Sequence, residues 1–172
     1  MAGSVPDRIR AAVESLEVRP TDQVLEIGPG PGVSVDLVAQ RLRRGRITAI
    51  DRSPVAVERA LRRNEAHVAA GRAVIRHLSL EELEADGERY DKVFAINVNL
   101  FWTRAAGPEL ELIRARLRPG GSLHLFYDGA AADARSEGIV AVLVSQLDAH
   151  GFTASALEPP LTGVVARPRA SP

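Results

Sequence analysis

Three glycines alternate with prolines directly after a short apolar run, in the stretch VLEIGPGPGVS at residues 24–34. The glycines are Gly28, Gly30 and Gly32, and the apolar run before them carries one acid, Glu26. Glycines between a strand and a helix make a tight turn and let a bound nucleotide approach the backbone closely. The stretch therefore predicts a nucleotide-binding loop, and its spacing bears on the kind of nucleotide.

The spacing of these glycines argues against a pyrophosphate ligand. A dinucleotide-binding loop follows G-x-G-x-x-G, and the position of its third glycine is occupied here by Val33. Pro29 and Pro31 also remove two backbone amides that phosphate oxygens would use. A nucleoside cofactor without a pyrophosphate fits better, which disfavours a nicotinamide-dependent dehydrogenase.

The elements that must position this loop alternate along the chain. Strands are predicted at 24–27, 46–51, 73–78, 92–97 and 122–127, with helices between them, and the runs 152–157 and 161–167 predict a closing hairpin. Such alternation builds right-handed βαβ units and a parallel sheet that is covered on both faces. We therefore predict an α/β fold: a doubly wound, mostly parallel seven-stranded sheet with helices on both faces and a C-terminal antiparallel hairpin. The length predicts a single domain over residues 1–172.

Polar residues stand where the predicted strands end, which is where ligands bind in such sheets. Asp51 ends the second strand, and an acid there can accept hydrogen bonds from both ribose hydroxyls. Ser79 and Asn97 follow the third and fourth strands. Two interpretations stay open for each: Ser79 also fits a helix cap with Glu82, and Asn97 could bond only to backbone.

The motif E-x-G-x-G-x-G, followed by an acid at the end of the next strand, resembles the class I S-adenosylmethionine-dependent methyltransferases. Three further segments are similar to that family in the same order: HLSLEEL (77–83), YDKVFAINVNLFW (90–102) and LRPGGSLHLF (117–126). The resemblance covers about residues 20–128. It implies S-adenosylmethionine as the cofactor and methyl transfer by in-line displacement at the sulfonium methyl.

The resemblance implies cofactor contacts for nine residues: Glu26, Gly28, Gly30, Gly32, Asp51, Arg52, Ser79, Leu80 and Asn97. The glycines would lie under the methionine part of the cofactor, and the acid before them would hold their loop. Asp51 would bind the ribose, Arg52 or Ser53 would flank the adenine, and Ser79 and Leu80 would contact the adenine from the other side. Asn97 would face the methionine and the acceptor. Ser79 departs from the family pattern, because many relatives carry Asp at that point.

The residues on the acceptor side are less distinctive, and no general base stands out. Tyr127 and Asp128 end the fifth strand and are the candidates for a base or an acceptor contact. Asn99, Phe101 and Trp102 lie just past the fourth strand and are predicted to form a wall of the acceptor pocket; packing against the following helix is the alternative. None of the four histidines pairs obviously with a carboxylate.

The composition of the chain limits which acceptors, metals and membrane contacts are expected. The formal net charge is zero, so a nucleic acid is not the expected acceptor, and a small molecule is. The absence of cysteine excludes disulfides, thiolate metal sites and a cysteine nucleophile, and no metal site is predicted. The sequence has neither a signal peptide nor an apolar run long enough to span a membrane, so we expect a cytoplasmic protein without membrane contact.

Two alternatives to a small-molecule methyltransferase stay open. VLEIGPGPG is also very similar to the opening motif of ribosomal RNA adenine dimethyltransferases, although those read Asn-Leu-Pro-Tyr where this chain reads NVNL at 97–100. The second alternative is an S-adenosylmethionine-binding sensor or partner subunit without catalysis. One short helix precedes the first predicted strand, so a partner chain or the second copy in a homodimer could supply the lid over the acceptor.

Overall fold

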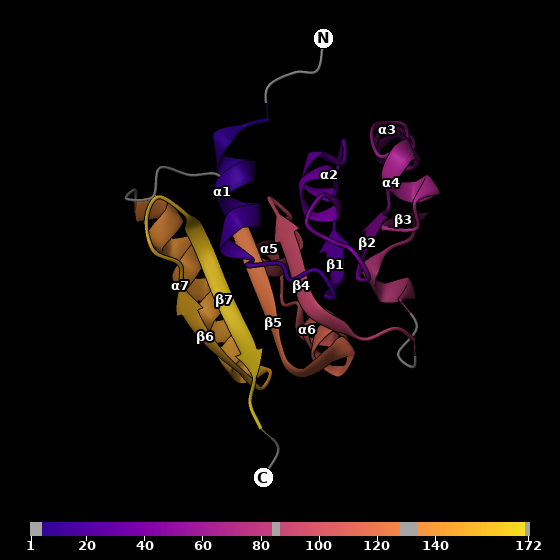
Figure 1. Ribbon diagram of the computed structural model, residues 1–172. Coiled ribbons are helices and arrows are strands. Elements are labelled where there is room, and N and C mark those ends of the chain that lie inside the picture. The colour runs from indigo at the N-terminus through magenta and orange to yellow at the C-terminus, as the bar shows by residue number, and fades with distance from the viewer. Residues whose placement is uncertain (1–4, 84–86, 128–133, 171–172) are drawn as a thin grey trace.

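The computed structural model describes residues 5–83, 87–127 and 134–170 of the chain. Seven strands form one sheet in the order β3-β2-β1-β4-β5-β7-β6, as Figure 1 shows. β1 to β5 pair in parallel, and β7 runs antiparallel to both β5 and β6. The strands are β1 (Gln23–Ile27), β2 (Arg46–Asp51), β3 (Ala73–His77), β4 (Tyr90–Ile96), β5 (Leu117–Tyr127), β6 (Phe152–Ala156) and β7 (Thr162–Pro168). The predicted seven-stranded α/β sheet and its closing hairpin are confirmed.

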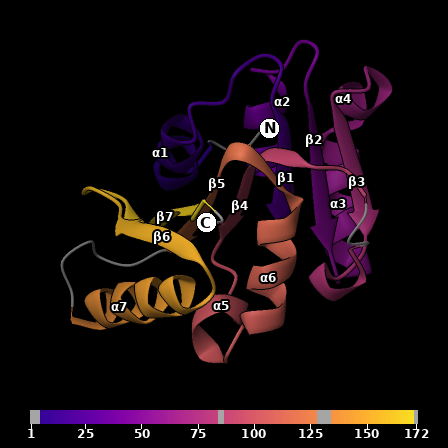
Figure 2. The same ribbon diagram turned by 90° about the horizontal axis from the view of Figure 1, so that it is seen from below.

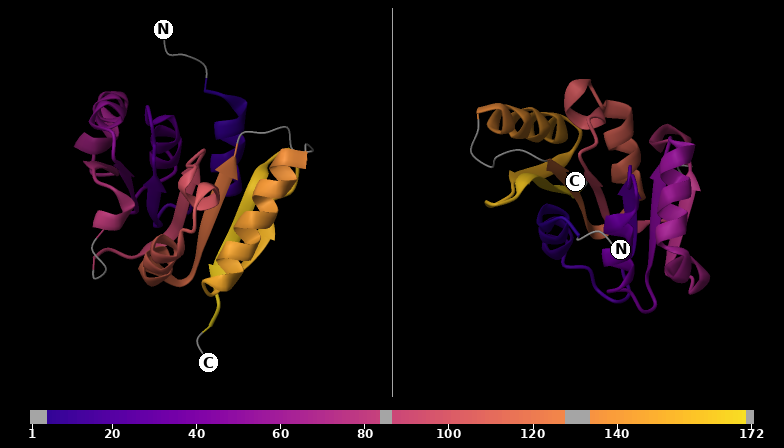
Figure 3. Two further views of the ribbon diagram at one scale, coloured as in Figure 1. Left: turned by 180° about the vertical axis from the view of Figure 1, so that it is seen from behind. Right: turned by 90° about the horizontal axis from the view of Figure 1, so that it is seen from above.

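Helices cover both faces of the sheet, which explains why its central strands are apolar on both sides. They are α1 (Asp7–Ser15), α2 (Val33–Ala39), α3 (Pro54–Arg63), α4 (Glu65–Ala69), α5 (Leu100–Thr103), α6 (Gly107–Arg116) and α7 (Ala134–Ala149), with a 3₁₀ turn η1 (Leu80–Glu82). Figure 2 shows α1 and α2 on one side of the sheet and α5, α6 and α7 on the other. Figure 3 shows α7 lying along the β6–β7 hairpin. In the part of the chain that the structure describes, no helix has both the length and the apolar character that crossing a bilayer requires.

The two faces of the sheet bury two separate cores. Along β4, Val93 and Ala95 belong to the core under α5, α6 and α7, whereas Phe94 belongs to the core under α1, α2 and α3. This division follows from the period of two in a strand, where successive side chains point to opposite faces. Because both cores are packed, the strand ends are held in fixed positions, and the loops at those ends can form a site.

Local sequence signals explain several element boundaries. Ser53 caps α3: its hydroxyl accepts a hydrogen bond from the Ala56 amide at 3.3 Å, and Pro54 is the first helical residue, as the sequence predicts. One short helix, α5, is absent from the sequence prediction, because it is too short to show a helical period. The helix expected between β2 and β3 is divided at Asn64 into α3 and α4. β5 also begins earlier than predicted, at Leu117, and its pairing with β4 shifts register between Tyr90 and Lys92.

Candidate functional site

The carboxyl ends of β1, β2 and β4 and the turn after β3 surround one cavity of about 430 Å³. Of the nine residues predicted to contact a cofactor, six line this cavity: Gly28, Asp51, Arg52, Ser79, Leu80 and Asn97. Asn99, predicted on the acceptor side, lines it as well. The other three predicted contacts lie outside its lining: Glu26 belongs to β1, and Gly30 and Gly32 belong to the glycine loop itself. The parallel order of the strands brings these residues together, as expected for the end of a doubly wound sheet.

The start of the glycine loop is held tightly against β2 and against the loop that follows β4. The Gly28 amide donates to the Ile50 carbonyl of β2 at 2.8 Å. Gly28 has a φ of +69°, and a Cβ at this position would come within 2.8 Å of Val98 Cγ2. Glycine is therefore required here for two reasons, because the backbone is left-handed and because Val98 occupies the space that a side chain would need.

Asp51 joins this loop to the start of α3. Its Oδ2 accepts a hydrogen bond from the Gly30 amide at 3.3 Å, and its Oδ1 accepts one from the Ser53 amide at 2.9 Å. A carboxylate has acceptor capacity beyond two bonds, so Asp51 can still accept from ligand hydroxyls at the cavity. The Asp51 carboxylate thus lines the cavity and also orders the glycine loop and the turn that leads into α3.

Glu26 is buried beneath the glycine loop, with 1% of its surface exposed. Ser34, in the first turn of α2, donates its hydroxyl proton to Oε1, and Oε2 has no hydrogen-bond partner among the described residues. Burial raises the pKa of Glu26 to about 8; the bond from Ser34 opposes the rise and the negative charge of Asp51 adds to it. Glu26 is predicted from the sequence, whereas Ser34 is not, although Ser34 stands at the start of an amphipathic helix.

At the opposite end of the cavity, Ser79 serves as a helix cap. Its amide and its hydroxyl both donate to Glu82 Oε2, each at 2.8 Å. The capping interpretation is therefore confirmed, and the residue lines the cavity at the same time. The backbone hydrogen bond to Glu82, with the hydroxyl bond second, holds the pKa of that carboxyl below its usual range.

Sequence reasoning missed an ion-pair group at this end of the cavity. Arg104 Nη2 lies 3.2 Å from Glu81 Oε1 and 2.5 Å from Glu109 Oε1. Arg104 and Glu81 both line the cavity, whereas Glu109 is 3% exposed and has its Oε2 buried without a partner among the described residues. Arg104 follows α5, which the sequence did not predict, so nothing in the local pattern pointed to it.

The residues predicted to contact the acceptor differ in their surroundings. Phe101 is 1% exposed and packs in the core, so it lines neither of the two cavities described here, and the packing alternative holds for it. Trp102 meets Tyr127 edge to face, with ring centroids 6.0 Å apart. Tyr127 donates its hydroxyl proton to the Val98 carbonyl at 3.1 Å, and burial raises the pKa of this phenol above its usual value. Asp128 lies outside the described residues.

A second cavity, of about 450 Å³, adjoins the end of β4. Ile96, Phe126 and Leu161 give it apolar walls, and Asp7 and Arg8 of α1 line it as well. Ile96 lines this cavity, whereas the next residue, Asn97, lines the first one. The two cavities therefore flank the end of β4, and Tyr127 lines the second cavity while its hydroxyl bonds to the wall of the first.

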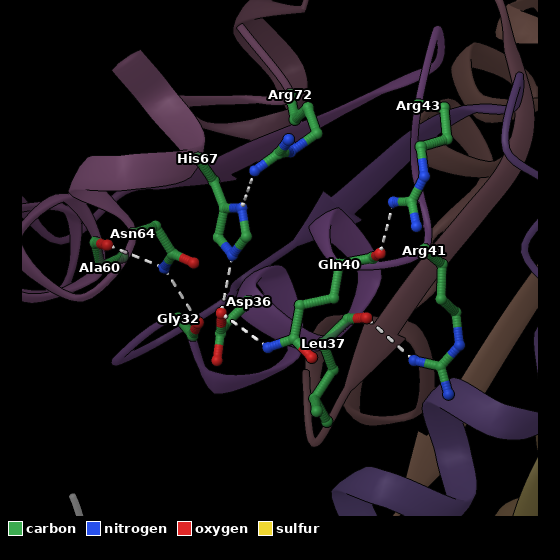
Figure 4. A network of polar contacts seen from close by, with 10 residues as sticks. All are labelled: Gly32, Asp36, Leu37, Gln40, Arg41, Arg43, Ala60, Asn64, His67 and Arg72. Atoms are coloured by element: carbon green, nitrogen blue, oxygen red, sulfur yellow. Dashed lines mark hydrogen bonds and ion pairs between the residues drawn. The ribbon is translucent and has the colours of Figure 1, made fainter. Parts of the chain in front are cut away.

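His67 pairs with a carboxylate in the structure. The expectation that no histidine pairs with a carboxylate is wrong, because His67 Nε2 lies 2.8 Å from Asp36 Oδ1, as Figure 4 shows. These residues come from α4 and α2, which only the tertiary structure brings together.

Within residues 5–83, 87–127 and 134–170, no three His, Asp or Glu side chains cluster as metal ligands would.

Comparison with known proteins agrees with this geometry. A family model described as "Methyltransferase domain" matches residues 24–121. An uncharacterised 37.1 kDa protein in transposon TN4556 of Streptomyces fradiae is 34% identical over 116 residues, which cover 64% of this chain and 31% of that protein. YrhH of Bacillus subtilis (strain 168) is 27% identical over 85 residues, which cover 49% of this chain and 46% of YrhH.

Solved structures extend the likeness to the whole described fold. The structure of the DhpI–SAH complex superposes with a TM-score of 0.71 at 23% identity, covering 94% of this chain and 84% of DhpI. The chain thus spans nearly all of that structure, but only about a third and about half of the two curated relatives. The matched segment, residues 24–121, contains every predicted cofactor contact and more than half of the chain. The chain therefore belongs to the methyltransferase-domain family, and it has the fold of the class I S-adenosylmethionine-dependent methyltransferases.

Proposed function

We propose that this chain binds S-adenosylmethionine in the cavity of about 430 Å³ and transfers its methyl group to a small-molecule acceptor. The observation that carries the proposal is the meeting of Gly28, Asp51 and Asn97 at one cavity, at the carboxyl ends of three adjacent parallel strands. When bound, the cofactor supplies a methyl group on a positively charged sulfur, which an acceptor lone pair displaces in line as the carbon–sulfur bond breaks.

The residues that line the cavity fit such a cofactor. Asp51 keeps acceptor capacity for the two ribose hydroxyls after its bonds to Gly30 and Ser53. Leu80 offers an apolar surface to the adenine ring, beside the polar Ser79. The glycine loop presents backbone rather than side chains to the methionine part, and its prolines withhold the amides that a pyrophosphate would need. We assign these residues to cofactor binding on that basis.

The second cavity is our proposed acceptor site. Its volume of about 450 Å³ lies in the range of small-molecule pockets, and its apolar walls with two charged residues suit a compact molecule with an apolar body. Ile96 and Asn97 are consecutive residues on opposite sides of the end of β4. An acceptor held there would reach the methyl group across the strand end. The zero net charge supports a small molecule over a nucleic acid.

Tyr127 fits the role of a positioning residue better than that of a general base. Its hydroxyl proton is donated to the Val98 carbonyl, and burial raises its pKa further above neutral pH, so it is a poor proton acceptor. It therefore fixes the loop that carries Val98 and Asn99 between the two cavities. Much of the rate enhancement would come from aligning the acceptor and excluding water, since the methyl group is already activated.

Isothermal titration calorimetry tests the cofactor, and transfer of a labelled methyl group to a small-metabolite extract tests the reaction. We expect S-adenosylmethionine and S-adenosylhomocysteine to bind and NADH not to bind. Tight binding of NADH without binding of S-adenosylmethionine would overturn the proposal. Tight cofactor binding with no transfer to any fraction would instead favour the non-catalytic sensor, and transfer confined to an RNA fraction would favour the RNA methyltransferase alternative.

A further inference from the structure

We propose that Asn64 is a positioning residue for the cofactor, acting through the glycine loop. Asn64 stands between α3 and α4 and is 1% exposed. Its Nδ2 donates to the Gly32 carbonyl at 3.0 Å and to the Ala60 carbonyl at 2.9 Å (Figure 4). Both neighbours are acceptors, so the NH₂ group of the amide must face them, and both of its protons are used.

The bond from Asn64 reaches the point where the glycine loop becomes a helix. The Gly32 carbonyl also accepts the Asp36 amide at 3.2 Å, which is the first helical bond of α2. Gly32 has a φ of +75°, and a Cβ there would lie 2.6 Å from Asn64 Nδ2 and 2.9 Å from Ala60 Cβ. The loop is thus pressed directly against α3, and a glycine is the residue that permits this approach.

Two neighbouring side chains, Arg63 and His67, also join α3 and α4 to the glycine loop and the start of α2. Figure 4 shows His67. Arg63 Nε donates to the Pro31 carbonyl at 3.1 Å, and His67 Nε2 lies 2.8 Å from Asp36 Oδ1. Together with Asn64, these residues reach from α3 and α4 to residues 31–36. Asn64 is the buried member of the three, so its bonds compete least with water.

Asn64 makes this contact from a break in the helical run. The backbone there departs from helical geometry, with φ −106° and ψ 17°, and α4 starts afresh at the next residue. A break costs helical hydrogen bonds, and here the side chain of the break residue closes the glycine loop instead. Because Gly28 and Gly30 are held by β2 and by Asp51, the bond at Gly32 fixes the remaining end of the loop.

The inference rests on the proposed function, in which the glycine loop lies under the methionine part of the cofactor and Asp51 holds the ribose. Substitution of Asn64 should then weaken the binding of ligands that carry the amino-acid part. It should leave the binding of ligands that lack this part nearly unchanged. S-adenosylhomocysteine and 5′-methylthioadenosine form such a pair, since they share the nucleoside and differ in the amino-acid part. A purely structural role would not separate the two ligands.

The first test is calorimetry on Asn64→Ala and Asn64→Leu, at a temperature where circular dichroism shows each variant folded. We expect the dissociation constant for S-adenosylhomocysteine to rise at least about fivefold, the scale of one lost hydrogen bond, and that for 5′-methylthioadenosine to change by less than about twofold. Glu58→Gln is the matched control on α3, because it removes an ion pair with Arg62 that is exposed to solvent. Unchanged affinities, or equal losses for both ligands, would overturn the inference.

A second variant, Asn64→Asp, keeps the shape of the side chain and makes the effect depend on pH. An ionised carboxylate opposite two carbonyl oxygens repels them, whereas a neutral carboxyl can donate one hydrogen bond. We expect its affinity for S-adenosylhomocysteine, relative to the unsubstituted protein at the same pH, to recover as the pH falls and the new carboxyl takes up a proton. A ratio that does not change with pH would contradict the assignment. If the unsubstituted protein binds neither ligand, the proposed cofactor fails instead.

Discussion

The buried carboxyl of Glu26 should make the stability of this protein depend on pH. The perturbation that isolates it is Glu26→Gln, which keeps the size of the side chain and its acceptor for the Ser34 hydroxyl but cannot ionise. Burial raises the pKa of Glu26 from an ordinary value of 4.5 to about 8, against the opposing bond from Ser34 and with the charge of Asp51 adding to the rise. In the unfolded chain the carboxyl returns to its ordinary pKa.

The sign follows from counting protons. Between pH 4.5 and pH 8 the folded protein holds a proton on Glu26 that the unfolded chain has lost, so unfolding releases a proton. The contribution of Glu26 to the free energy of unfolding therefore falls as the pH rises through this window, and that contribution is level below it and above it. At about 1.4 kcal/mol per pKa unit, the fall has an upper value of about 5 kcal/mol, and we expect about 2–5 kcal/mol.

The assay is urea denaturation of the parent and of Glu26→Gln at several pH values from 4.5 to 9. The difference in unfolding free energy between the two proteins removes the contributions of all other groups, and it should move steadily in favour of the variant up to about pH 8. Glu58→Gln is the control for removing an exposed carboxylate. A flat difference for Glu26→Gln would refute the reasoning, since it would mean that Glu26 ionises equally in both states.

Three further predictions concern the same site. Asp51→Ala should weaken S-adenosylmethionine binding by about 1.5–3 kcal/mol in calorimetry, because charge-assisted hydrogen bonds are lost, and unchanged affinity would remove Asp51 from the site. Gly28→Ala should cost more stability than Gly30→Ala, since both add strain at positive φ but only the first clashes with a neighbour, and equal urea midpoints would contradict this. Arg104→Ala should cost about 1–3 kcal/mol, because it leaves the buried carboxylate of Glu109 without the half-exposed Arg104, and adding Glu109→Gln should restore most of the urea midpoint; no recovery would refute the ion-pair account.

The fold was predictable because its signals are local. β2 has the predicted bounds, Arg46–Asp51, and α3 begins where Ser53 and Pro54 predict. A strand is indicated by its apolar run and a helix start by its cap, and both are read over a few residues. The helix that was missed, α5, is too short to show a period, and it carries the predicted acceptor residues Phe101 and Trp102.

The sequence by itself determined the family, the order of the strands along the chain and the residue types at the strand ends. Only the tertiary structure decided which atoms meet, because the contacts join residues that are far apart in sequence: Gly30 to Asp51 over 21 positions, and Asn64 to Gly32 over 32. It also decided that Phe101 is core and that the hydroxyl of Tyr127 is a donor to Val98. The physical reason is that hydrogen-bond partners and burial depend on how the sheet and its helices pack in space. A local sequence pattern does not predict that packing.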